Sequence, residues 1–247
     1  MSVAQAATLD DAIAQAVAAL DFERSRKEYW EQNECLHLKG FLPPEVVERY
    51  FVPQVNSLKP KLNRNYIPGS KKGGSVSYFT VREQAREFMA LYRSSAFIDF
   101  LKRLTNAPVQ FCPETDPHAC ALYYYTEPGD HIGWHYDTSY YKGARYTILL
   151  GLVDRSPSCK LMCQLYKDDP TRPMKEITPS TGPGDMVIFN GDKLWHSVTP
   201  LGEGEERTVL TMEYVTDQGM NPLKRVYSNL KDSFGYFGLK AVFGGKS

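Results

Sequence analysis

The 247-residue sequence has no excess of charge of either sign, because 29 basic side chains balance 29 acidic ones. Proteins that bind nucleic acid or an anionic membrane through their overall field carry a clear basic excess. We therefore expect no nucleic-acid partner and no membrane partner. The chain also lacks an apolar run of about 18 residues, which a membrane-spanning helix requires.

Cysteines are few, odd in number and scattered, at Cys35, Cys112, Cys120, Cys159 and Cys163. Such a set does not form the disulfide framework of a secreted domain. Cys159 and Cys163 have no second pair to complete a zinc site, so we interpret them as packing residues. The first thirty residues lack the basic start and apolar run of a secretory signal. Together these absences predict a cytoplasmic protein.

The N-terminal region, residues 1–108, is predicted to be mainly helical. Apolar residues recur there at helical spacing in four segments, near 10–20, 43–51, 81–92 and 96–104. The stretch 66–74 is rich in Pro, Gly, Ser and Lys and predicts a loop.

The central region, residues 109–216, is predicted to form a β-structure. Strand-like segments lie at 119–126, 131–136, 145–154, 159–166, 174–178, 185–190, 195–199 and 206–216, separated by turn residues such as Glu127-Pro128-Gly129-Asp130. About eight strands at this spacing suggest a sandwich or jelly roll. The fold class is thus mainly β with flanking helices. Residues 217–247 are predicted to be a tail that packs on this core, which makes 1–247 a single domain.

Three side chains of the central region are candidate metal ligands. His135 and Asp137 are two positions apart in a predicted strand, so their imidazole and carboxylate point to the same side. His196, farther along the chain, completes a set of two histidines and one carboxylate. This set leaves three coordination positions open and suits non-haem Fe(II) working with O₂.

Arg207 follows His196 by eleven residues, inside an apolar strand. A guanidinium that faces a buried pocket needs an anion, and a carboxylate is its natural bidentate partner. An isolated His-x-Asp triplet or a single strand arginine is usually structural. The whole array is far more specific, because Pro183-Gly184-Asp185 precedes the second histidine and every member lies in a predicted strand.

This array resembles the Fe(II)/2-oxoglutarate-dependent dioxygenases, whose catalytic core is a double-stranded β-helix, or jelly roll. The resemblance covers roughly residues 119–216. It implies that His135, Asp137 and His196 bind Fe(II) and that Arg207 holds the far carboxylate of the cosubstrate 2-oxoglutarate. It also implies an oxidoreductase that uses O₂ and releases succinate and CO₂.

Two segments are similar to the branch of that superfamily that acts on free amino acids, namely 131–143 and 229–238. The branch includes amino-acid hydroxylases such as lysine hydroxylases, carrier-independent amino-acid halogenases, and an aziridine-forming valine oxygenase. The resemblance therefore implies a small-molecule substrate, attack on an unactivated C–H bond, and a role in natural product biosynthesis. Halogenases have Gly in place of the metal carboxylate, so Asp137 favours hydroxylation, desaturation or oxidative cyclisation.

Further residues are predicted to line the site. Two strand residues are candidate contacts of 2-oxoglutarate, Tyr123 and Thr147. Five residues are candidate substrate contacts: His131, Thr138, Thr211, Glu213 and Lys72. Glu213 shares a strand face with Arg207 and could accept a substrate ammonium group, the alternative being a surface carboxylate. Lys71 and Lys72 could supply a cation from a mobile lid, the alternative being a solvated basic loop.

Two other functions stay open at this stage. One is a protein or peptide side-chain hydroxylase of the same superfamily. The other is a cupin-like jelly roll that binds metal without turnover, although cupins use more histidines than the five in this chain. The sequence does not indicate an oligomeric state.

Overall fold

The protein is described here from a computed structural model that covers residues 8–137 and 141–219. The predicted packing of the tail beyond residue 219 and the predicted substrate contact of Thr138 lie outside the described residues.

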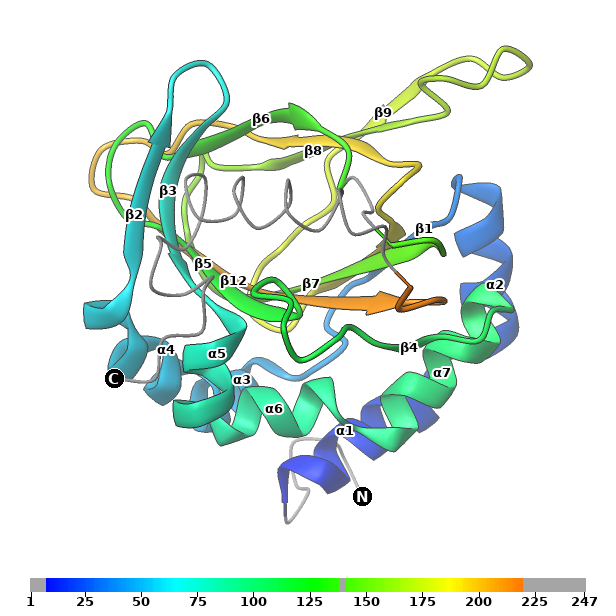
Figure 1. Cartoon of the computed structure of the whole chain (residues 1–247), viewed down its shortest axis with the longest axis horizontal. Helices are drawn as coiled ribbons and strands as arrows, with labels where there is room; N and C mark the ends of the chain where they lie inside the picture. Colours follow the sequence, from blue (N-terminus) through cyan, green and yellow to red (C-terminus); the bar gives the residue numbers. More distant parts are fainter. Residues whose placement is uncertain (1–7, 138–140, 220–247) are drawn as a thin grey trace.

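One antiparallel sheet of twelve strands curls on itself so that two layers face each other (Figure 1). The larger layer has the order β1-β10-β7-β12-β5, and the smaller has the order β6-β11-β8-β9. Strand β3 joins them, because it pairs with β5 and also with β6. The strands are β1 (Cys35–Leu38), β2 (Asn63–Ile67), β3 (Lys71–Val76), β4 (Gln110–Phe111), β5 (Cys120–Tyr125), β6 (His131–His135), β7 (Arg145–Arg155), β8 (Leu161–Leu165), β9 (Lys175–Ile177), β10 (Met186–Asn190), β11 (Trp195–Val198) and β12 (Glu206–Val215).

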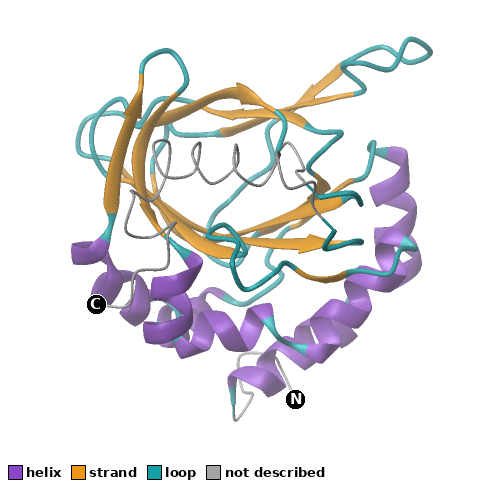
Figure 2. Cartoon of the chain, in the orientation of Figure 1, coloured by secondary structure: helices purple, strands orange, loops and turns teal. Residues whose placement is uncertain are grey.

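Helices cover the outer face of the larger layer (Figure 2). They are α1 (Leu9–Ala18), α2 (Phe22–Glu31), α3 (Pro44–Tyr50), α4 (Val52–Leu58), the short 3₁₀ helix η2 (Lys59–Lys61), α5 (Tyr78–Gln84), α6 (Arg86–Tyr92) and α7 (Ser95–Thr105). The predicted fold class, a mainly β jelly roll with flanking helices, is confirmed, and each of the eight predicted central strands is present.

Strand alternation divides the apolar residues into two cores. On β7, Ile148 and Leu150 point to the helices and join a large cluster with residues such as Phe88 and Leu101. Leu149, between them, points into the barrel and joins a smaller cluster. Each fully buried side chain of this size contributes roughly 1.5–3 kcal/mol. The larger layer is therefore mainly apolar on its helix side, while its barrel side carries polar groups such as Thr147, Glu213 and Arg207.

The prediction of a mainly helical N-terminal region is only partly right. Three strands lie within 1–108, and the predicted loop 66–74 is the turn and second strand of the β2–β3 hairpin. Of the three glycines that suggested a loop, Gly69 lies in the turn, whereas Gly73 and Gly74 are strand residues and Gly74 is at a place of close approach. A Cβ on Gly74 would lie 2.8 Å from Leu62 Cδ1. Glycine allows this packing although it is unfavourable in an isolated strand.

The predicted helices also need two corrections. The segment 81–92 is two helices, because Ala85 leaves the helical conformation with φ −136° and ψ 73°. Helix α2 was not predicted, because its sequence is strongly polar and only Ser25 and Tyr29 are buried. The segment 96–104 is confirmed as α7, which the Ser94 side chain caps by accepting a hydrogen bond from Phe97 N.

Gly151 brings a distant turn against the centre of β7. Its amide donates to Asp185 O at 2.9 Å, and Gly184 N donates to Gly151 O at 3.0 Å. A Cβ on Gly151 would lie 2.1 Å from Gly182 O and 2.2 Å from Thr181 O. This close approach positions Thr181, which contacts Arg207 in the barrel.

We expect Gly151→Ala to lower the free energy of unfolding by about 3 kcal/mol, because backbone atoms must move to accept the methyl group. Gly73→Ala is the matched control, since a Cβ at that strand position would meet only Tyr124 O, at 3.7 Å. The control should change stability by less than about 1 kcal/mol. Urea unfolding of both variants measures the difference, and equal effects would contradict the assigned crossing of the turn over β7.

Candidate metal centre

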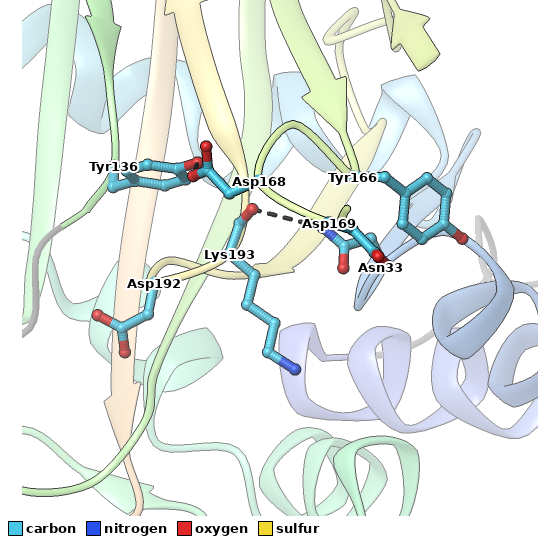
Figure 3. A pocket seen from close by; sticks show the side chains of 7 residues that line it. All are labelled: Asn33, Tyr136, Tyr166, Asp168, Asp169, Asp192 and Lys193. Atoms are coloured by element: carbon cyan, nitrogen blue, oxygen red, sulfur yellow. Dashed lines mark hydrogen bonds between the residues drawn. The ribbon is translucent and has the colours of Figure 1, made fainter. Parts of the chain in front are cut away.

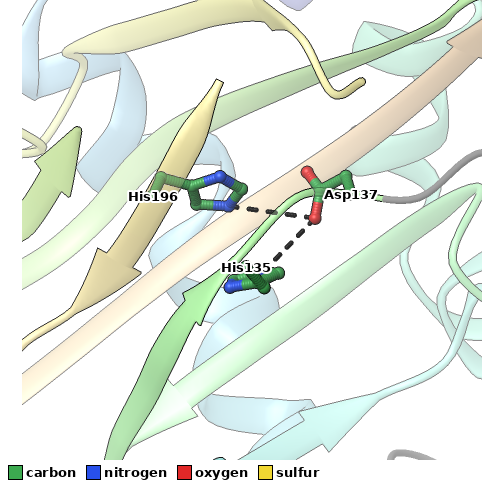
Figure 4. Close-up of side chains that lie close together, drawn as sticks. All are labelled: His135, Asp137 and His196. Atoms are coloured by element: carbon green, nitrogen blue, oxygen red, sulfur yellow. Dashed lines mark ion pairs between the residues drawn. The ribbon is translucent and has the colours of Figure 1, made fainter. Parts of the chain in front are cut away.

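The three predicted metal ligands converge inside the barrel (Figure 4). His135 ends β6, and His196 lies directly opposite it on β11. Asp137 follows His135 by two residues, and its Oδ1 lies 3.4 Å from His135 Nε2 and 3.8 Å from His196 Nε2. Donor atoms bound at about 2.0–2.2 Å to one cation lie roughly 3 Å apart. The three side chains therefore fit a single metal ion.

Backbone carbonyls fix both imidazole rings. Nδ1 of His135 lies 2.8 Å from Gly133 O, and Nδ1 of His196 lies 3.1 Å from Leu194 O. A carbonyl oxygen only accepts, so each Nδ1 carries the proton and each Nε2 presents its lone pair to the centre. This arrangement of the outer ring nitrogen is common in histidine metal ligands.

Electrostatics keep the site in the protonation state that binds metal. Burial lowers the pKa of His196 to about 4, so the imidazole is neutral near pH 7. Burial alone would raise the pKa of Asp137, but the imidazoles of His196 and His135 hold it well below its usual value. A neutral imidazole and an ionised carboxylate are the forms that coordinate a cation.

Asp137 is oriented by contacts outside the triad. Thr147 donates to Asp137 Oδ2 at 2.7 Å, and the Asp137 amide donates to Gly191 O at 3.0 Å. A Cβ on Gly191 would lie 2.8 Å from Asp137 Cβ, so glycine leaves room for the carboxylate. Oδ2 is thereby held by the protein, and Oδ1 faces the imidazoles.

A buried ion pair lies behind Thr147. Thr147 Oγ1 lies 2.9 Å from Glu213 Oε2, and Arg145 Nε donates to the same oxygen at 3.0 Å. All three side chains are buried. Burial raises the pKa of Glu213, and the Arg145 guanidinium opposes that shift and favours the ionised carboxylate. Because a hydroxyl has one proton, Thr147 can donate to only one of the two carboxylates, Asp137 or Glu213, at a time.

Arg207 is the largest fully buried side chain described, with 1% exposure, and it points into the barrel from β12. Its Nε and Nη2 donate to Thr181 Oγ1 at 3.1 and 3.0 Å, and its guanidinium lies 5.1 Å from the centre of the Tyr125 ring. Among the described residues, the buried Nη1 has no hydrogen-bond acceptor. A buried guanidinium nitrogen without an acceptor fits a site for an anion.

A β-bulge changes the predicted orientation of β6. His135 pairs with His196, but Ile132 rather than Gly133 pairs with Val198. The extra residue lets both His135 and Ile132 face the barrel interior. His131 consequently faces outward, opposite Lys72 on β3. The predicted substrate contact of His131 would need this side chain to face the interior, and it stays a prediction that this placement does not favour.

The two lysines that were predicted to supply a substrate cation point to opposite sides of β3. Lys72 faces outward, where it donates to Pro128 O at 2.7 Å and lies 3.9 Å from Glu127. Lys71 is the buried one, with 2% exposure, and its Nζ lies 5.0 Å from the centre of the Tyr123 ring. Of the two lysines, Lys71 is therefore the one that could supply a cation inside the barrel, and it does so from a strand rather than from a loop.

The other predicted contacts point into the barrel. Tyr123 pairs with Val209 across β5 and β12, and its hydroxyl lies 3.0 Å from His118 Nδ1. Thr211 and Glu213 lie on the same barrel-facing side of β12 and are buried. Thr147 contacts Asp137 rather than any site near Arg207, so its structural surroundings suit orientation of the metal carboxylate better than binding of 2-oxoglutarate.

Three residues of the site were not predicted from sequence: Arg145, Lys71 as an interior group, and Thr181. Arg145 could have been found by alternation, because it is two positions before Thr147 in a predicted strand. Nothing in the sequence marked Thr181 as a site residue, because the turn that contains it reaches the site only through its tertiary contact with Gly151.

A separate pocket of about 220 Å³ lies near the barrel mouth (Figure 3). Its lining residues are Asn33, Tyr136, Tyr166, Asp168, Asp169, Asp192 and Lys193. None of the three candidate metal ligands lines it, and of its two neighbouring aspartates Asp168 is exposed and Asp169 is half-buried. The interior site around the triad is therefore the better candidate for chemistry.

No protein-family profile and no curated protein matches the sequence. Solved structures do match the fold. A Pseudomonas putida prolyl-4-hydroxylase is 15% identical with a TM-score of 0.62, covering 80% of this chain and all of the other. A Trichoplax adhaerens prolyl hydroxylase, solved with a peptide fragment of hypoxia inducible factor, is 14% identical with a TM-score of 0.63 and covers 92% of this chain and 99% of the other.

The epimerase SnoN from nogalamycin biosynthesis, described as non-haem and α-ketoglutarate dependent, is 15% identical with a TM-score of 0.63. It covers 78% of this chain and 81% of its own. At these identities the likeness establishes the fold. Within the described ranges, none of the helices is both long and apolar enough to cross a bilayer.

We expect Thr147→Val to weaken metal binding by about 10- to 100-fold, because Asp137 loses the hydrogen bond that orients it. Titration of the metal-free protein with Co(II), followed by visible absorption, measures the affinity. Thr211→Val is the matched control, since it removes a hydroxyl from the same barrel face without a contact to Asp137. Equal Co(II) affinities for wild type and Thr147→Val would show that this hydroxyl does not position the ligand.

Proposed function

We propose that this protein is an Fe(II)- and 2-oxoglutarate-dependent oxygenase that acts on an unactivated C–H bond of a free amino acid. The observation that carries the proposal is the meeting of His135, Asp137 and His196 in the same barrel interior as the buried, incompletely paired Arg207. The fold shared with the solved structures supports it. A metal centre without an anion site would fit a cupin-like binding protein equally well.

The triad would hold Fe(II) on one face through two imidazole nitrogens and one carboxylate oxygen. Such a set leaves the opposite face open for other ligands. The chemistry supplied there is oxidation of a substrate C–H bond by O₂, coupled to conversion of 2-oxoglutarate to succinate and CO₂. The protein contributes the orientation of Asp137, the protonation states of the imidazoles, and exclusion of water by the surrounding barrel.

Arg207 would bind the far carboxylate of 2-oxoglutarate. Its guanidinium is held in place by Thr181 on one edge and by the Tyr125 ring on its face. This leaves Nη1 available to donate to a carboxylate, and burial strengthens that interaction. Tyr123 and Lys71, which lie together near this part of the barrel, would complete the walls of the cosubstrate site.

Two observations favour a free amino acid. The segments 131–143 and 229–238 are similar to enzymes of that branch. The barrel interior near the triad also contains charges of both signs, on Arg145 and Glu213, as a zwitterionic substrate requires. With a carboxylate at Asp137, hydroxylation or oxidative cyclisation, such as aziridine formation on a valine-like substrate, is favoured over halogenation. A role in natural product biosynthesis and a cytoplasmic location are part of the same proposal.

A protein or peptide side chain is the second candidate substrate. The prolyl hydroxylase solved with a peptide fragment covers more of this chain than the other two structures described above. A peptide would enter the same metal site, so the two candidates differ in the substrate rather than in the roles of the triad and Arg207.

We expect one or more of the twenty free amino acids to stimulate succinate release from 2-oxoglutarate in the presence of Fe(II), ascorbate and O₂. His135→Ala should abolish release, because one of three metal ligands is lost. His131→Ala, on the outward face of the same strand, should retain it. Succinate and modified products are measured by mass spectrometry. Stimulation only by peptides would favour the second candidate, and no release with any substrate would favour a binding protein.

Arg207→Ala should raise the KM for 2-oxoglutarate by at least about 30-fold, because a buried carboxylate loses its cation. Arg155→Ala is the matched control. Arg155 is an exposed arginine at the end of β7, and it lies opposite Glu206, the residue before Arg207, in the register of β7 and β12. It should leave that KM within about twofold of wild type. An unchanged KM in Arg207→Ala would show that another cation binds the far carboxylate of 2-oxoglutarate.

A further inference from the structure

Arg145 is a second buried arginine in the barrel, and the proposed chemistry does not yet use it. It begins β7 and has 7% exposure. Its side chain lies on the same barrel-facing side of β7 as Thr147, two residues later. Burial alone would lower the pKa of Arg145, but the carboxylates of Glu213 and Asp116 raise it well above its usual value, so it remains a cation.

The hydrogen bonds of Arg145 are incomplete within the described residues. Nε donates to Glu213 Oε2, and no described acceptor lies within hydrogen-bonding distance of the two terminal Nη nitrogens. Asp116 is near enough to act electrostatically, but it accepts hydrogen bonds from Tyr141 Oη at 2.7 Å and from His118 N at 2.8 Å. The terminal nitrogens are not among the fully buried atoms that lack a partner, so they remain accessible to an anionic ligand inside the barrel.

Glu213 likewise uses only one of its two carboxylate oxygens in hydrogen bonds with described residues. Both of its described contacts, with Arg145 and with Thr147, are made by Oε2. Among the described residues, Oε1 accepts no hydrogen bond, although the side chain is only 3% exposed. Oε1 is not among the fully buried atoms that lack a partner, so it is accessible to a cationic donor. The pair thus presents a donor fork and an acceptor side by side.

The pair also lies at the distance from the metal centre that a small substrate needs. Contacts of 3.0, 2.9 and 2.7 Å connect Arg145 Nε to Asp137 Oδ2 through Glu213 and Thr147. Arg145 Nε therefore lies no farther from Asp137 Oδ2 than the sum of these three distances. A small amino acid bound there by its head group would therefore lie close to the triad.

Arg207 cannot serve the same anion. Arg207 and Glu213 are six residues apart on β12, which separates their Cα atoms by roughly 20 Å along the strand. The barrel therefore has two separate cation sites, and only one is needed for the far carboxylate of 2-oxoglutarate.

We propose that Arg145 and Glu213 together bind the head group of an α-amino acid, with the carboxylate on the Nη nitrogens of Arg145 and the ammonium group on Glu213 Oε1. This inference rests on the proposed function and specifies its substrate site. The Nε–Oε2 contact fixes the two side chains relative to each other, so the site recognises the two charges of the head group. Other residues would select the amino-acid side chain.

The test measures binding to the Mn(II)-loaded protein with 2-oxoglutarate, without O₂, by isothermal titration calorimetry. The probes are the twenty free amino acids, and for each one that binds, its amide and its N-acetyl derivative. In wild type we expect both derivatives to bind at least about tenfold more weakly, because each lacks one charge of the head group. An amide and an N-acetyl derivative that bind as tightly as the parent amino acid would overturn the proposal without any variant.

Two variants assign the charges to residues. Arg145→Lys keeps a cation but loses the fork, and should weaken the amino acid at least about tenfold. Glu213→Gln should weaken the amino acid but not its N-acetyl derivative. Both should bind 2-oxoglutarate as wild type does, which also shows that they fold. Should either variant fail to fold, the derivatives tested on wild type still decide.

The outcomes separate this proposal from the proposed function. Amino-acid-dependent succinate release together with unchanged amino-acid affinity in Arg145→Lys would overturn the head-group site and leave the oxygenase in place. Binding of no free amino acid to wild type would overturn the head-group site, and succinate release with peptides would then support the second candidate substrate.

Discussion

The pairing of His135 with His196 across β6 and β11 is the contact on which the proposed chemistry depends. These two strands come from distant parts of the sequence, and their register decides whether both imidazoles face inward. A slip by one residue would turn one imidazole to the outer face, because side chains alternate. The neighbouring bulge is part of the same constraint, since it lets Ile132 pack inside the barrel without moving His135 outward.

Given that register, the larger layer supplies the polar side chains that surround the three metal ligands in the barrel. Its helix-facing side is filled by apolar residues, which provide the free energy to fix β7 and β12. Its barrel-facing side can then present charges that would be unfavourable in an ordinary core. Arg207, Arg145 and Glu213 are each buried, and each is held by at least one hydrogen bond. Of their atoms, Arg207 Nη1 is buried without a described acceptor, and a ligand anion would satisfy it.

The sequence was sufficient to predict the eight central strands, because turn residues and alternation mark them directly. It was also sufficient to select His135, Asp137, His196 and Arg207, because their spacing forms a specific array. It failed where tertiary contacts override local pattern. Gly74 suggested a loop but lies in β3, where Leu62 packs against it. The bulge in β6, which turns His131 outward, is not visible in the residues that surround it.

Arg145 shows a different limit. Alternation from Thr147 was enough to place it inside the barrel, yet a strand arginine by itself is usually solvated. What separates it from a surface residue is the combination of burial, a single bond through Nε, and a carboxylate whose second oxygen is also open. A simple structural ion pair would be expected to use the terminal nitrogens of the fork and both carboxylate oxygens, since that gives the strongest pairing. Side-on pairing through Nε and Oε2 leaves the terminal nitrogens of Arg145 and Oε1 of Glu213 without described partners, and the proposed head-group site rests on this asymmetry.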